Sequence, residues 1–371
     1  MKIKKTGILF LLVFSLILGG CSAADMTKDT QADKVYKTKT EQGSIDNSEN
    51  ASQKQNAKKL KVHFINVGQG SSTLVESNGH YMLIDGGDRD YSTRVVAYLK
   101  KRKVKTLDYV IATHYDADHL NGVVGAISAF KVKKVIAPDY TTESKVYTSF
   151  IEGVKSKNLS VTYPQIGKKY NIGNAKFTIL APNDTHYDDE NDFSVAIKLV
   201  NGKNSFVITG DAGIESEYEM LETGINLSCD VYVAGHHGSR YSSSEAFLQA
   251  MKPKSVVVSA GKGNKYGHPS EEALARFKAM KCKLYRTDKS GDIIATSDGK
   301  KITFSCKDVK ISEADMVSAE SEKGKYIGNI NSKKYHTSDC SSLPYEQNRV
   351  YFKSKEEAEA AGYEPCGLCR P

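Results

Sequence analysis

The densest group of reactive side chains in the sequence is a short run that begins at residue 113. Thr113-His114-Tyr115-Asp116-Ala117-Asp118-His119 supplies two imidazoles and two carboxylates within six residues. Imidazole nitrogens and carboxylate oxygens are ligands for divalent cations such as Zn²⁺ and Mn²⁺. Polar groups crowded in this way repel one another unless a cation lies among them. On a loop that enters a helix, His114 and Asp116 would face one ion, and Asp118 and His119 a second.

More metal-type ligands follow other short apolar segments along the chain. They are, in chain order, Asp211, the pair His236 and His237, and His268. Open α/β sheets collect the residues of their sites at the carboxyl ends of strands. Taken singly, each of these residues is equally well explained as a turn or core residue. Together with the first run, they predict one cleft lined by metal ligands.

The chemistry that this cleft predicts is metal-dependent hydrolysis. Two ions close together activate water at neutral pH and stabilise the oxygens of a displaced ester. The sequence contains no Gly-x-Ser-x-Gly motif that would favour a serine nucleophile instead. We expect Asp118 and Asp211 at the reacting centre, with His268 binding or protonating the leaving group.

A second set of ligands lies near the C-terminus. His336-x-x-x-Cys340 and Cys366-x-x-Cys369 have the spacing of a closed, structural zinc site. A disulfide between Cys366 and Cys369 is the alternative, but His336 completes a four-ligand set and favours zinc. The segment is too short to build a stable core alone. Of the other cysteines, Cys282 and Cys306 could pair in an oxidising compartment, or they could stay buried thiols like Cys229.

The elements that must position these residues alternate between strands and helices. Strands are predicted at 62–67, 73–75, 81–84, 109–112, 134–137, 176–180, 193–200, 205–209, 231–234, 256–259 and 284–286, and a closing hairpin at 292–295 and 302–304. Helices are predicted over 91–103 and 354–361 and after Thr141, Ile214, Ser242 and Ser270. The sum is two mixed sheets covered by helices, an α/β layered enzyme.

The N-terminus resembles a bacterial lipoprotein signal. Lysines at positions 2, 4 and 5 precede the apolar run 8–18, which ends in Leu18-Gly19-Gly20-Cys21. The run is too short to span a bilayer comfortably, so we expect cleavage before Cys21, a diacylglycerol on its thiol and a place on the outer face of the cell membrane. An ordinary signal peptide is the alternative. The domains follow as signal 1–21, disordered tether 22–59, hydrolase 60–307, linker 308–324 and zinc module 325–371.

Seven motifs in fixed order carry a family resemblance over about 61–304. They are Asn66-Val67-Gly68-Gln69-Gly70, Leu83-Ile84-Asp85-Gly86-Gly87, His114-x-Asp116-x-Asp118-His119, Asn191-Asp192-x-Ser194, Thr209-Gly210-Asp211, Gly235-His236-His237-Gly238-Ser239 and Gly267-His268-Pro269. They resemble the metallo-β-lactamase superfamily, and within it the hydrolase domain of the ComEC competence proteins. The resemblance implies the αββα sandwich and a hydrolytic centre with two divalent ions.

The same resemblance assigns ligands residue by residue. It implies a first site of His114, Asp116 and a bridging Asp211, and a second of Asp118, His119, Asp211 and either His236 or His237. Asp116 stands where most members have His, and this extra carboxylate fits Mn²⁺ as well as Zn²⁺. Asn191 or Ser194 would occupy the place of a further ligand. With Ser239, these two residues are the expected substrate-binding positions.

The C-terminal segment 326–371 resembles the Ada-type zinc-binding domain, with His336 in place of the first cysteine of that family. The resemblance hints at nucleic acid and implies no methyl transfer. The net charge of +8, from 52 Lys and Arg against 44 Asp and Glu, favours an anionic partner. The leading prediction is a nuclease or phosphodiesterase that acts on DNA. The alternatives are a phosphodiesterase of wall polymers such as choline-bearing teichoic acid, and a non-catalytic DNA-binding surface protein.

Overall fold

The computed structural model describes residues 59–312 and 325–371, apart from positions 330, 339, 341 and 345–347. We call the first range the large domain and the second the C-terminal module. The predicted lipidation site Cys21, the predicted tether up to residue 58 and most of the predicted linker lie outside the described residues. Within the described residues, no helix has the length and apolar character to cross a bilayer.

The first sheet of the large domain has eight strands. Their order across the sheet is β17 (Ile302–Phe304), β16 (Ile293–Ser297), β1 (Leu60–Phe64), β2 (Thr73–Ser77), β3 (His80–Ile84), β5 (Tyr109–Ile111), β7 (Val135–Ile136) and β8 (Val161–Thr162). Strands β1, β3, β5, β7 and β8 point the same way. A separate parallel pair is formed by β4 (Thr106–Leu107) and β6 (Lys131–Val132).

The second sheet has seven strands. Their order is β15 (Lys283–Arg286), β14 (Ser255–Val258), β13 (Val231–Val233), β12 (Asn204–Ile208), β11 (Ala196–Asn201), β10 (Ala175–Ala181) and β9 (Lys169–Ile172). Strands β12, β13, β14 and β15 are parallel to one another. The two sheets touch at one end, where Asn174 N donates to Ser77 Oγ at 3.1 Å and Lys203 N donates to Gly299 O at 2.8 Å. The C-terminal ends of β5, β12 and β13 therefore meet at the opposite end, which we call the rim.

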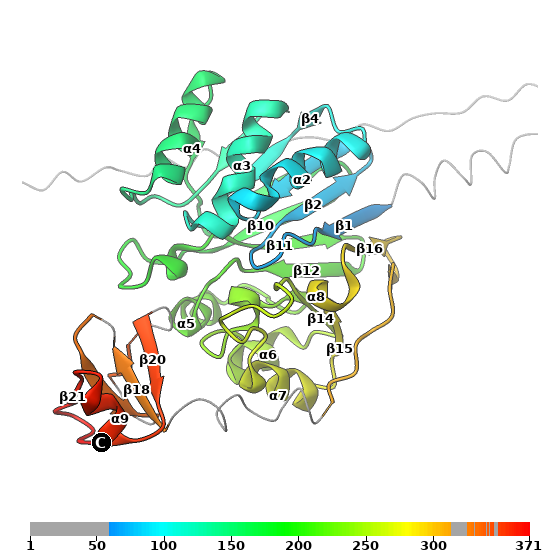
Figure 1. The fold of residues 1–371 in the computed structure, drawn as a ribbon. Helices are drawn as coiled ribbons and strands as arrows, with labels where there is room; N and C mark the ends of the chain where they lie inside the picture. The colour runs from blue at the N-terminus through cyan, green and yellow to red at the C-terminus, as the bar shows by residue number, and fades with distance from the viewer. Residues whose placement is uncertain (1–58, 313–324, 330, 339, 341, 345–347) are drawn as a thin grey trace, which may run out of the picture. The chain divides into compact units, whose positions relative to one another are not determined.

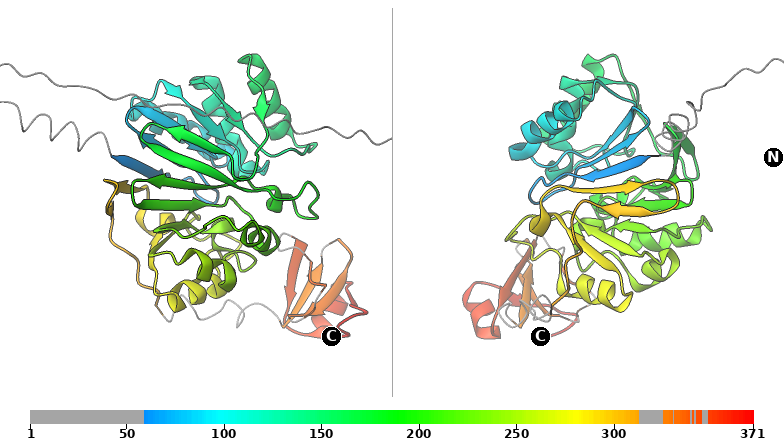
Figure 2. Two further views of the ribbon diagram at one scale, coloured as in Figure 1. Left: turned by 180° about the vertical axis from the view of Figure 1, so that it is seen from behind. Right: turned by 90° about the vertical axis from the view of Figure 1, so that its right-hand side faces the viewer.

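Helices cover the outer face of each sheet (Figures 1 and 2). Those on the first sheet are α2 (Arg89–Lys101), α3 (Ala117–Ala129) and α4 (Lys145–Ser156), and those on the second are α5 (Ile214–Glu222), α6 (Glu245–Met251) and α7 (Glu271–Ala279). Shorter turns are η1 (Glu190–Phe193), η2 (Gly235–Gly238) and α8 (Thr287–Ser290). A continuous apolar core that includes Phe64, Phe177 and Phe206 fills the space between the sheets. The α/β class and the αββα sandwich predicted from the sequence are confirmed.

Serine hydroxyls begin three of these helices. Ser144, Ser244 and Ser270 each accept a hydrogen bond from the backbone N–H three residues later, a cap that typically contributes ~1 kcal/mol. Asp116 occupies the same position before α3 but makes no side-chain cap hydrogen bond. Its carboxylate is therefore left for the rim.

Two local differences from the sequence prediction lie at the rim. The strand predicted from Phe193 begins only at Ala196, because residues 190–193 form the turn η1. There Ser194 N donates to Asn191 O at 3.0 Å, and Val195 N donates to Thr113 O at 2.8 Å. These bonds outweigh the β-propensity of the segment. The short helix α8 was not predicted.

The C-terminal module has one four-stranded sheet, ordered β20 (Arg349–Phe352), β18 (Tyr326–Asn329), β19 (Lys334–Thr337) and β21 (Glu364–Pro365). The helix α9 (Lys355–Ala360) confirms the predicted helix. Its buried core consists of Tyr326, Tyr335, Phe352, Ala358 and Tyr363. A core of this size gives little driving force for folding.

Candidate metal centre

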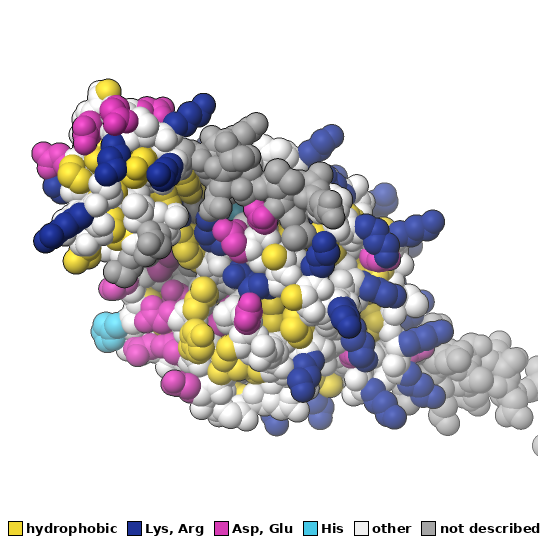
Figure 3. Space-filling view, turned by 90° about the horizontal axis from the view of Figure 1, so that it is seen from below, with side chains coloured by type: hydrophobic (Ala, Val, Ile, Leu, Met, Phe, Trp, Pro, Cys, Tyr) yellow, Lys and Arg dark blue, Asp and Glu magenta, His cyan; other side chains and the backbone are white. Residues whose placement is uncertain are grey.

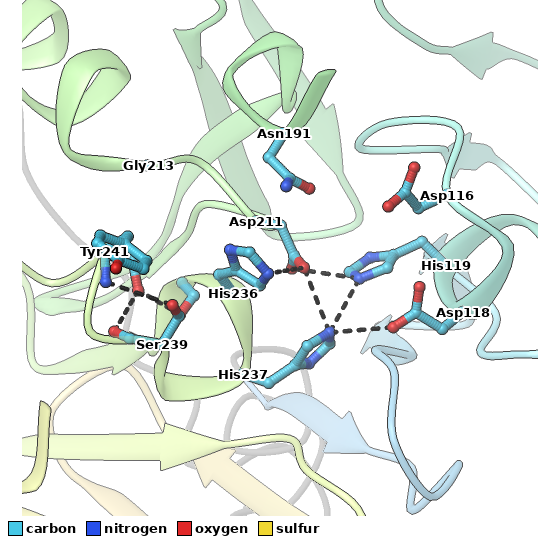
Figure 4. Close-up of polar contacts among 12 residues, drawn as sticks. Asp116, Asp118, His119, Asn191, Asp211, Gly213, His236, His237, Ser239 and Tyr241 are labelled. Atoms are coloured by element: carbon cyan, nitrogen blue, oxygen red, sulfur yellow. Dashed lines mark hydrogen bonds and ion pairs between the residues drawn. The ribbon is translucent and has the colours of Figure 1, made fainter. Parts of the chain in front are cut away.

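The metal-type residues predicted from the sequence meet at the rim (Figure 4). His114 follows β5, and Asp118 and His119 lie in the first turn of α3. Asp211 follows β12, and His237 lies in the turn after β13. Each sheet therefore delivers ligands to the same place, as the polarity of its strands requires.

Four side chains point their ligand atoms at one another. His119 Nε2 lies 3.2 Å from Asp211 Oδ1 and 3.2 Å from His237 Nε2. His237 Nε2 lies 3.3 Å from both Asp118 Oδ2 and Asp211 Oδ2. Two imidazole nitrogens that face each other this closely need a proton or a cation between them. The arrangement fits a divalent ion.

A second group overlaps the first, because His114, His119 and Asp211 also bring ligand atoms together. His114 is fully buried, and its Nε2 has no hydrogen-bond partner among the described residues. Burial, helped by the neighbouring His119, lowers the pKa of His114 to about 4. The ring is therefore neutral at pH 7 and can offer a lone pair. Asp211 faces His119 through Oδ1 and His237 of the first group through Oδ2, at 3.2 and 3.3 Å, so its carboxylate can serve both groups and the rim fits two adjacent ions.

The charges of the cluster are matched to a cation. Burial opposes ionisation of Asp211, but the imidazoles of His119 and His237 outweigh it and hold the pKa of Asp211 well below its usual range. In turn, Asp211 and Asp85 overcome the burial of His119 and raise its pKa well above the ordinary value. The carboxylates thus stay charged and demand positive charge beside them. A divalent ion supplies that charge while each ring keeps only the proton on Nδ1 and offers Nε2 as a ligand.

Asp85 fixes the orientation of His119 within the cluster. His119 Nδ1 donates to Asp85 Oδ2 at 2.8 Å, and Thr113 donates to the same carboxylate through its backbone N and its hydroxyl, each at 2.8 Å. The ring of His119 is thereby fixed with Nε2 toward the cluster. Close packing helps, since a Cβ on Gly122 would lie 1.8 Å from Gly86 O. The sequence motif that contains Asp85 does not by itself reveal this supporting role.

The two adjacent histidines have different positions. His236 and His237 both adopt positive φ, 48° and 56°, which turns their rings apart. His237 is buried, and its Nδ1 donates to Ser259 O at 2.8 Å, so its Nε2 faces the cluster. His236 Nε2 is 3.8 Å from Asp211 Oδ2, and the side chain is 22% exposed. The geometry therefore favours His237 as the ligand that the sequence left open.

Two further predicted residues stand at the edge of the cluster. Asp116 Oδ2 lies 3.9 Å from His114 Nε2, and the Asp116 side chain is 51% exposed. The ring of His268 lies 5.5 Å from that of His236 and 6.3 Å from that of His237, between centroids. Asp116 can therefore approach an ion only from the solvent side. His268 is placed to contact a bound substrate and not to coordinate an ion.

The three predicted substrate-binding residues differ in what they contact. Asp211 N donates to Ser194 Oγ at 3.1 Å, and this hydroxyl lies 3.4 Å from His114 Nδ1. Ser194 thus contacts the ligand residues Asp211 and His114 from within the fold. Ser239 is also buried and accepts from Tyr241 N at 3.3 Å. Asn191 lies beside Asp211 at the rim (Figure 4), and its Oδ1 has no hydrogen-bond partner among the described residues. Among the three, the geometry favours Asn191 for substrate contact.

A buried network behind the histidine turn was missed by the sequence analysis. The Glu217 carboxylate accepts from the backbone N–H groups of Ser243 and Ser244, the latter at 2.7 Å. Tyr232 Oη accepts from Gly235 N at 2.9 Å, and Arg276 donates to Ser242 O at 2.9 Å. Nothing in the residue types near position 217 signals this role, because the contacts come from the fold.

The C-terminal module brings together its predicted four ligands, His336, Cys340, Cys366 and Cys369. His336 Nδ1 lies 3.3 Å from Cys340 Sγ, and His336, Cys340 and Cys366 are buried. Three sulfurs and one imidazole are the donor set of a structural zinc site. In the large domain, Cys229, Cys282 and Cys306 are free thiols. The structure thus supports free thiols over a Cys282–Cys306 pair, with Cys229 buried and the other two half-buried.

Comparison with known families agrees with the fold and both clusters. The model of the metallo-β-lactamase superfamily matches residues 65–262, more than half of the chain. The chain belongs to this superfamily, and as such is a metal-dependent hydrolase by class. The model of the metal-binding domain of Ada matches residues 318–371.

Three bacterial proteins are similar to this chain over about 60% of its length. ComE operon protein 3 of Bacillus subtilis is 28% identical over 251 residues, which cover 63% of this chain and 32% of that protein. Competence protein ComA of Neisseria gonorrhoeae is 32% identical over 229 residues, 61% of this chain and 30% of its own length. Recombination protein 2 of Haemophilus influenzae is 28% identical over 63% of this chain. The chain thus spans about a third of the length of these relatives.

Among solved structures, the metallo-β-lactamase fold protein YhfI from Bacillus subtilis is 14% identical. The match covers 64% of this chain and 99% of that one, with a TM-score of 0.45. CmlA, a diiron β-hydroxylase from Streptomyces venezuelae, is also 14% identical and has a TM-score of 0.43. That match covers 61% of this chain and 52% of CmlA.

Proposed function

We propose that this chain is an exported, lipid-anchored metallohydrolase that uses two divalent ions to cleave phosphodiester bonds in DNA. The observation that carries the proposal is the pair of ligand groups at the rim that Asp211 joins, with one carboxylate oxygen facing His119 and the other facing His237. His114, Asp116 and Asp211 would hold one ion, and Asp118, His119, Asp211 and His237 the other. When bound, such ions activate water and neutralise the charge that develops on a phosphodiester.

The chain's own residues orient this chemistry. Asp211 stands between the two ligand groups, and Asp85 and Ser259 O fix the rings of His119 and His237 through their Nδ1 atoms. His268, at the edge of the cluster, would bind the leaving oxygen or give it a proton. An acid–base group of this kind typically contributes ~10²-fold or more in rate, so His268→Ala should cost much less than loss of a ligand.

Three observations favour DNA as the substrate. One of the relatives carries a name that refers to competence, and another carries a name that refers to recombination. The C-terminal module matches the metal-binding domain of Ada, and the chain has a net charge of +8. The positive charge favours a polyanionic partner.

The proposal is tested with the full chain, loaded in parallel with Zn²⁺ and Mn²⁺. Plasmid DNA, bis-p-nitrophenyl phosphate and choline-bearing teichoic acid are offered as substrates. We expect metal-dependent cleavage of the first two, lost in Asp118→Ala. If neither metal supports cleavage of DNA, or if Asp118→Ala retains it, the proposal is wrong. The more active metal identifies the ion.

One feature of the rim favours the wall polymer as a second candidate. The loop before η1 carries Asp188 and Asp189, and η1 begins with Glu190; these acids would repel the phosphates of DNA. The ring of Tyr140 lies 4.5 Å from that of Phe193, so aromatic faces lie near these acids. Acids and aromatic rings together attract quaternary ammonium groups. Cleavage of choline-bearing teichoic acid but not DNA would establish this candidate.

Export and lipidation rest on the sequence before the described residues, chiefly on Leu18-Gly19-Gly20-Cys21. Cys21→Ala should release the protein from the membrane fraction or leave its signal uncleaved. Fractionation of cells with antibody detection checks this. Lipid labelling that persists in the Cys21→Ala variant would contradict the assignment.

A further inference from the structure

Lysines gather at the end of the large domain opposite the rim. Their positions follow from the strand polarity, because they lie in turns that precede strands or follow the helices that run back from the rim. We call the following six exposed residues the lysine end: Lys103, Lys105, Lys131, Lys203, Lys300 and Lys301. In the space-filling view, Lys and Arg crowd the right-hand part of the domain and acidic side chains its left-hand part (Figure 3).

Backbone contacts join the lysine end into one surface across both sheets. Lys131 N donates to Lys105 O at 3.4 Å, beside the β4–β6 pair. Lys203 N donates to Gly299 O at 2.8 Å, which places the turn after β11 against the turn that carries Lys300. Leu60, the first residue of β1, pairs with Ser297 just before that turn. The chain therefore enters the large domain at the lysine end.

The acids at this end compensate for few of the lysines. Asp108 is 2.6 Å from Lys133 Nζ, and Asp230 is 2.8 Å from Lys254 Nζ, so each is engaged by a lysine outside the six. Asp298 accepts from the backbone N of Lys300 and of Lys301, at 2.8 and 2.9 Å. The lysine end thus keeps a large excess of positive charge.

We propose that the lysine end binds an anionic lipid surface and turns the rim away from it. Lysine acts as a mobile point charge, which suits headgroups, whereas sites for single-stranded nucleic acid interleave cations with exposed aromatic rings. The exposed aromatics among the described residues of the large domain are Tyr91, Tyr163, Tyr218 and Tyr266. All belong to segments near the rim, and none to the lysine end. Entry of the chain at Leu60 fits the same orientation.

The test is sedimentation with vesicles of phosphatidylglycerol and phosphatidylcholine in equal parts, against pure phosphatidylcholine. Three full-length proteins are compared, all with Cys21→Ala to remove any lipid. One carries no further change, one adds Lys203→Glu, Lys300→Glu and Lys301→Glu, and the control adds Lys145→Glu, Lys168→Glu and Lys169→Glu. The control makes the same change in net charge at exposed positions on the rim half. The N-terminal apolar run is common to all three.

We expect the parent and the control to bind the anionic vesicles, and the lysine-end variant to bind at least ~10-fold more weakly. Equal binding by the three proteins, or equal binding of the parent to both kinds of vesicle, would overturn the proposal. So would a lysine-end variant that loses affinity for DNA while keeping its affinity for vesicles, since that result assigns the surface to nucleic acid. Unchanged circular dichroism and phosphodiesterase turnover check that the variants are folded.

Discussion

The two ligand clusters of this chain are supported in opposite ways. At the rim, two sheets and three large apolar clusters hold Asp118, His119, Asp211 and His237 in place. In the C-terminal module, four ligands lie beside a core of five buried residues. The comparison teaches that the fold builds the first site, whereas the second site helps to build its fold.

Hydrogen bonds around the ligands show the same contrast. At the rim, His119 donates a hydrogen bond to Asp85, His237 donates one to Ser259 O, and Asp211 N donates one to Ser194 Oγ. In the module, the contacts of Cys366 Sγ and His336 Nδ1 are local, to Leu368 N at 3.4 Å and to Cys340 Sγ at 3.3 Å. We therefore expect loss of ligands to remove activity at the rim, and to remove structure in the module.

The largest expected effect is that of Asp211→Ala. This carboxylate faces both ligand groups, so its loss should lower phosphodiesterase turnover by at least ~10³-fold. The large domain should stay folded, because Asp211 contributes charge and no apolar core. Turnover on bis-p-nitrophenyl phosphate and the thermal unfolding curve are the two measurements.

Two outcomes of Asp211→Ala would contradict this contrast between the rim and the module. Turnover near that of the parent would exclude a two-ion centre at this rim. A large domain that unfolds along with the activity loss would mean that the ions build this fold too. Asp230→Ala is a matched control, since Asp230 lies at the far end of β13 and pairs with Lys254.

The second prediction concerns Cys366→Ser in the module. Loss of one thiolate should release the zinc, and structural zinc in small domains typically contributes ~10 kcal/mol or more of binding free energy. The module should then unfold, while turnover of a small phosphodiester at the rim stays near that of the parent. Zinc content and limited proteolysis between residues 325 and 371 measure the change. A protease-resistant, zinc-free module would contradict it.

The sequence alone predicts those site residues that carry a local signal, such as their position after a strand or their spacing. His114, Asp118, His119 and Asp211 could be predicted because each directly follows an apolar strand or begins a helix, and strand polarity then fixes the shared rim. The αββα layers followed from the same alternation and from the family resemblance. The module's four ligands were identifiable from their spacing alone.

The sequence could not predict the features of the site that tertiary contacts determine. His236 and His237 are indistinguishable as types, and only the bond from His237 Nδ1 to Ser259 O separates them. Glu217 looks like any helical glutamate until Ser243 and Ser244 are seen to donate to it. The strand start at Ala196 also depended on a hydrogen bond to a distant segment.

The third prediction tests the support beneath the rim. Asp85→Asn keeps the size of the side chain but offers a single acceptor oxygen, where three donors now converge on two. The ring of His119 should lose its fixed orientation, and outer-shell changes of this kind typically cost ~10–100-fold in metal affinity or activity. Metal titration followed by turnover at saturating metal separates the two effects. If neither the metal affinity nor the turnover changes, Asp85 does not support the metal centre.

The last prediction concerns Glu217→Gln, behind the histidine turn, and its effect is on stability and not on the metal ligands. Burial raises the pKa of Glu217 from 4.5 to about 7, although its bonds from Ser243 and Ser244 oppose the shift. The folded state therefore binds a proton more tightly than the unfolded state. The resulting stability is fully present below about pH 4.5 and is lost as pH rises through about 7, by a total of about 3 kcal/mol.

Glutamine does not titrate, so the variant should lack this fall in stability. At low pH it should be the less stable protein, because its single carbonyl oxygen cannot serve both backbone donors as well as a carboxyl group does. The difference should narrow as the pH rises past about 7. Denaturant unfolding of parent and variant across this range measures it, with the C-terminal module kept zinc-loaded in both. Parallel stability curves would show that Glu217 is not the titrating group. A variant that also loses metal at the rim would show that the turn after β13 depends on this carboxylate, which would extend the supporting shell of the first site one layer further into the fold.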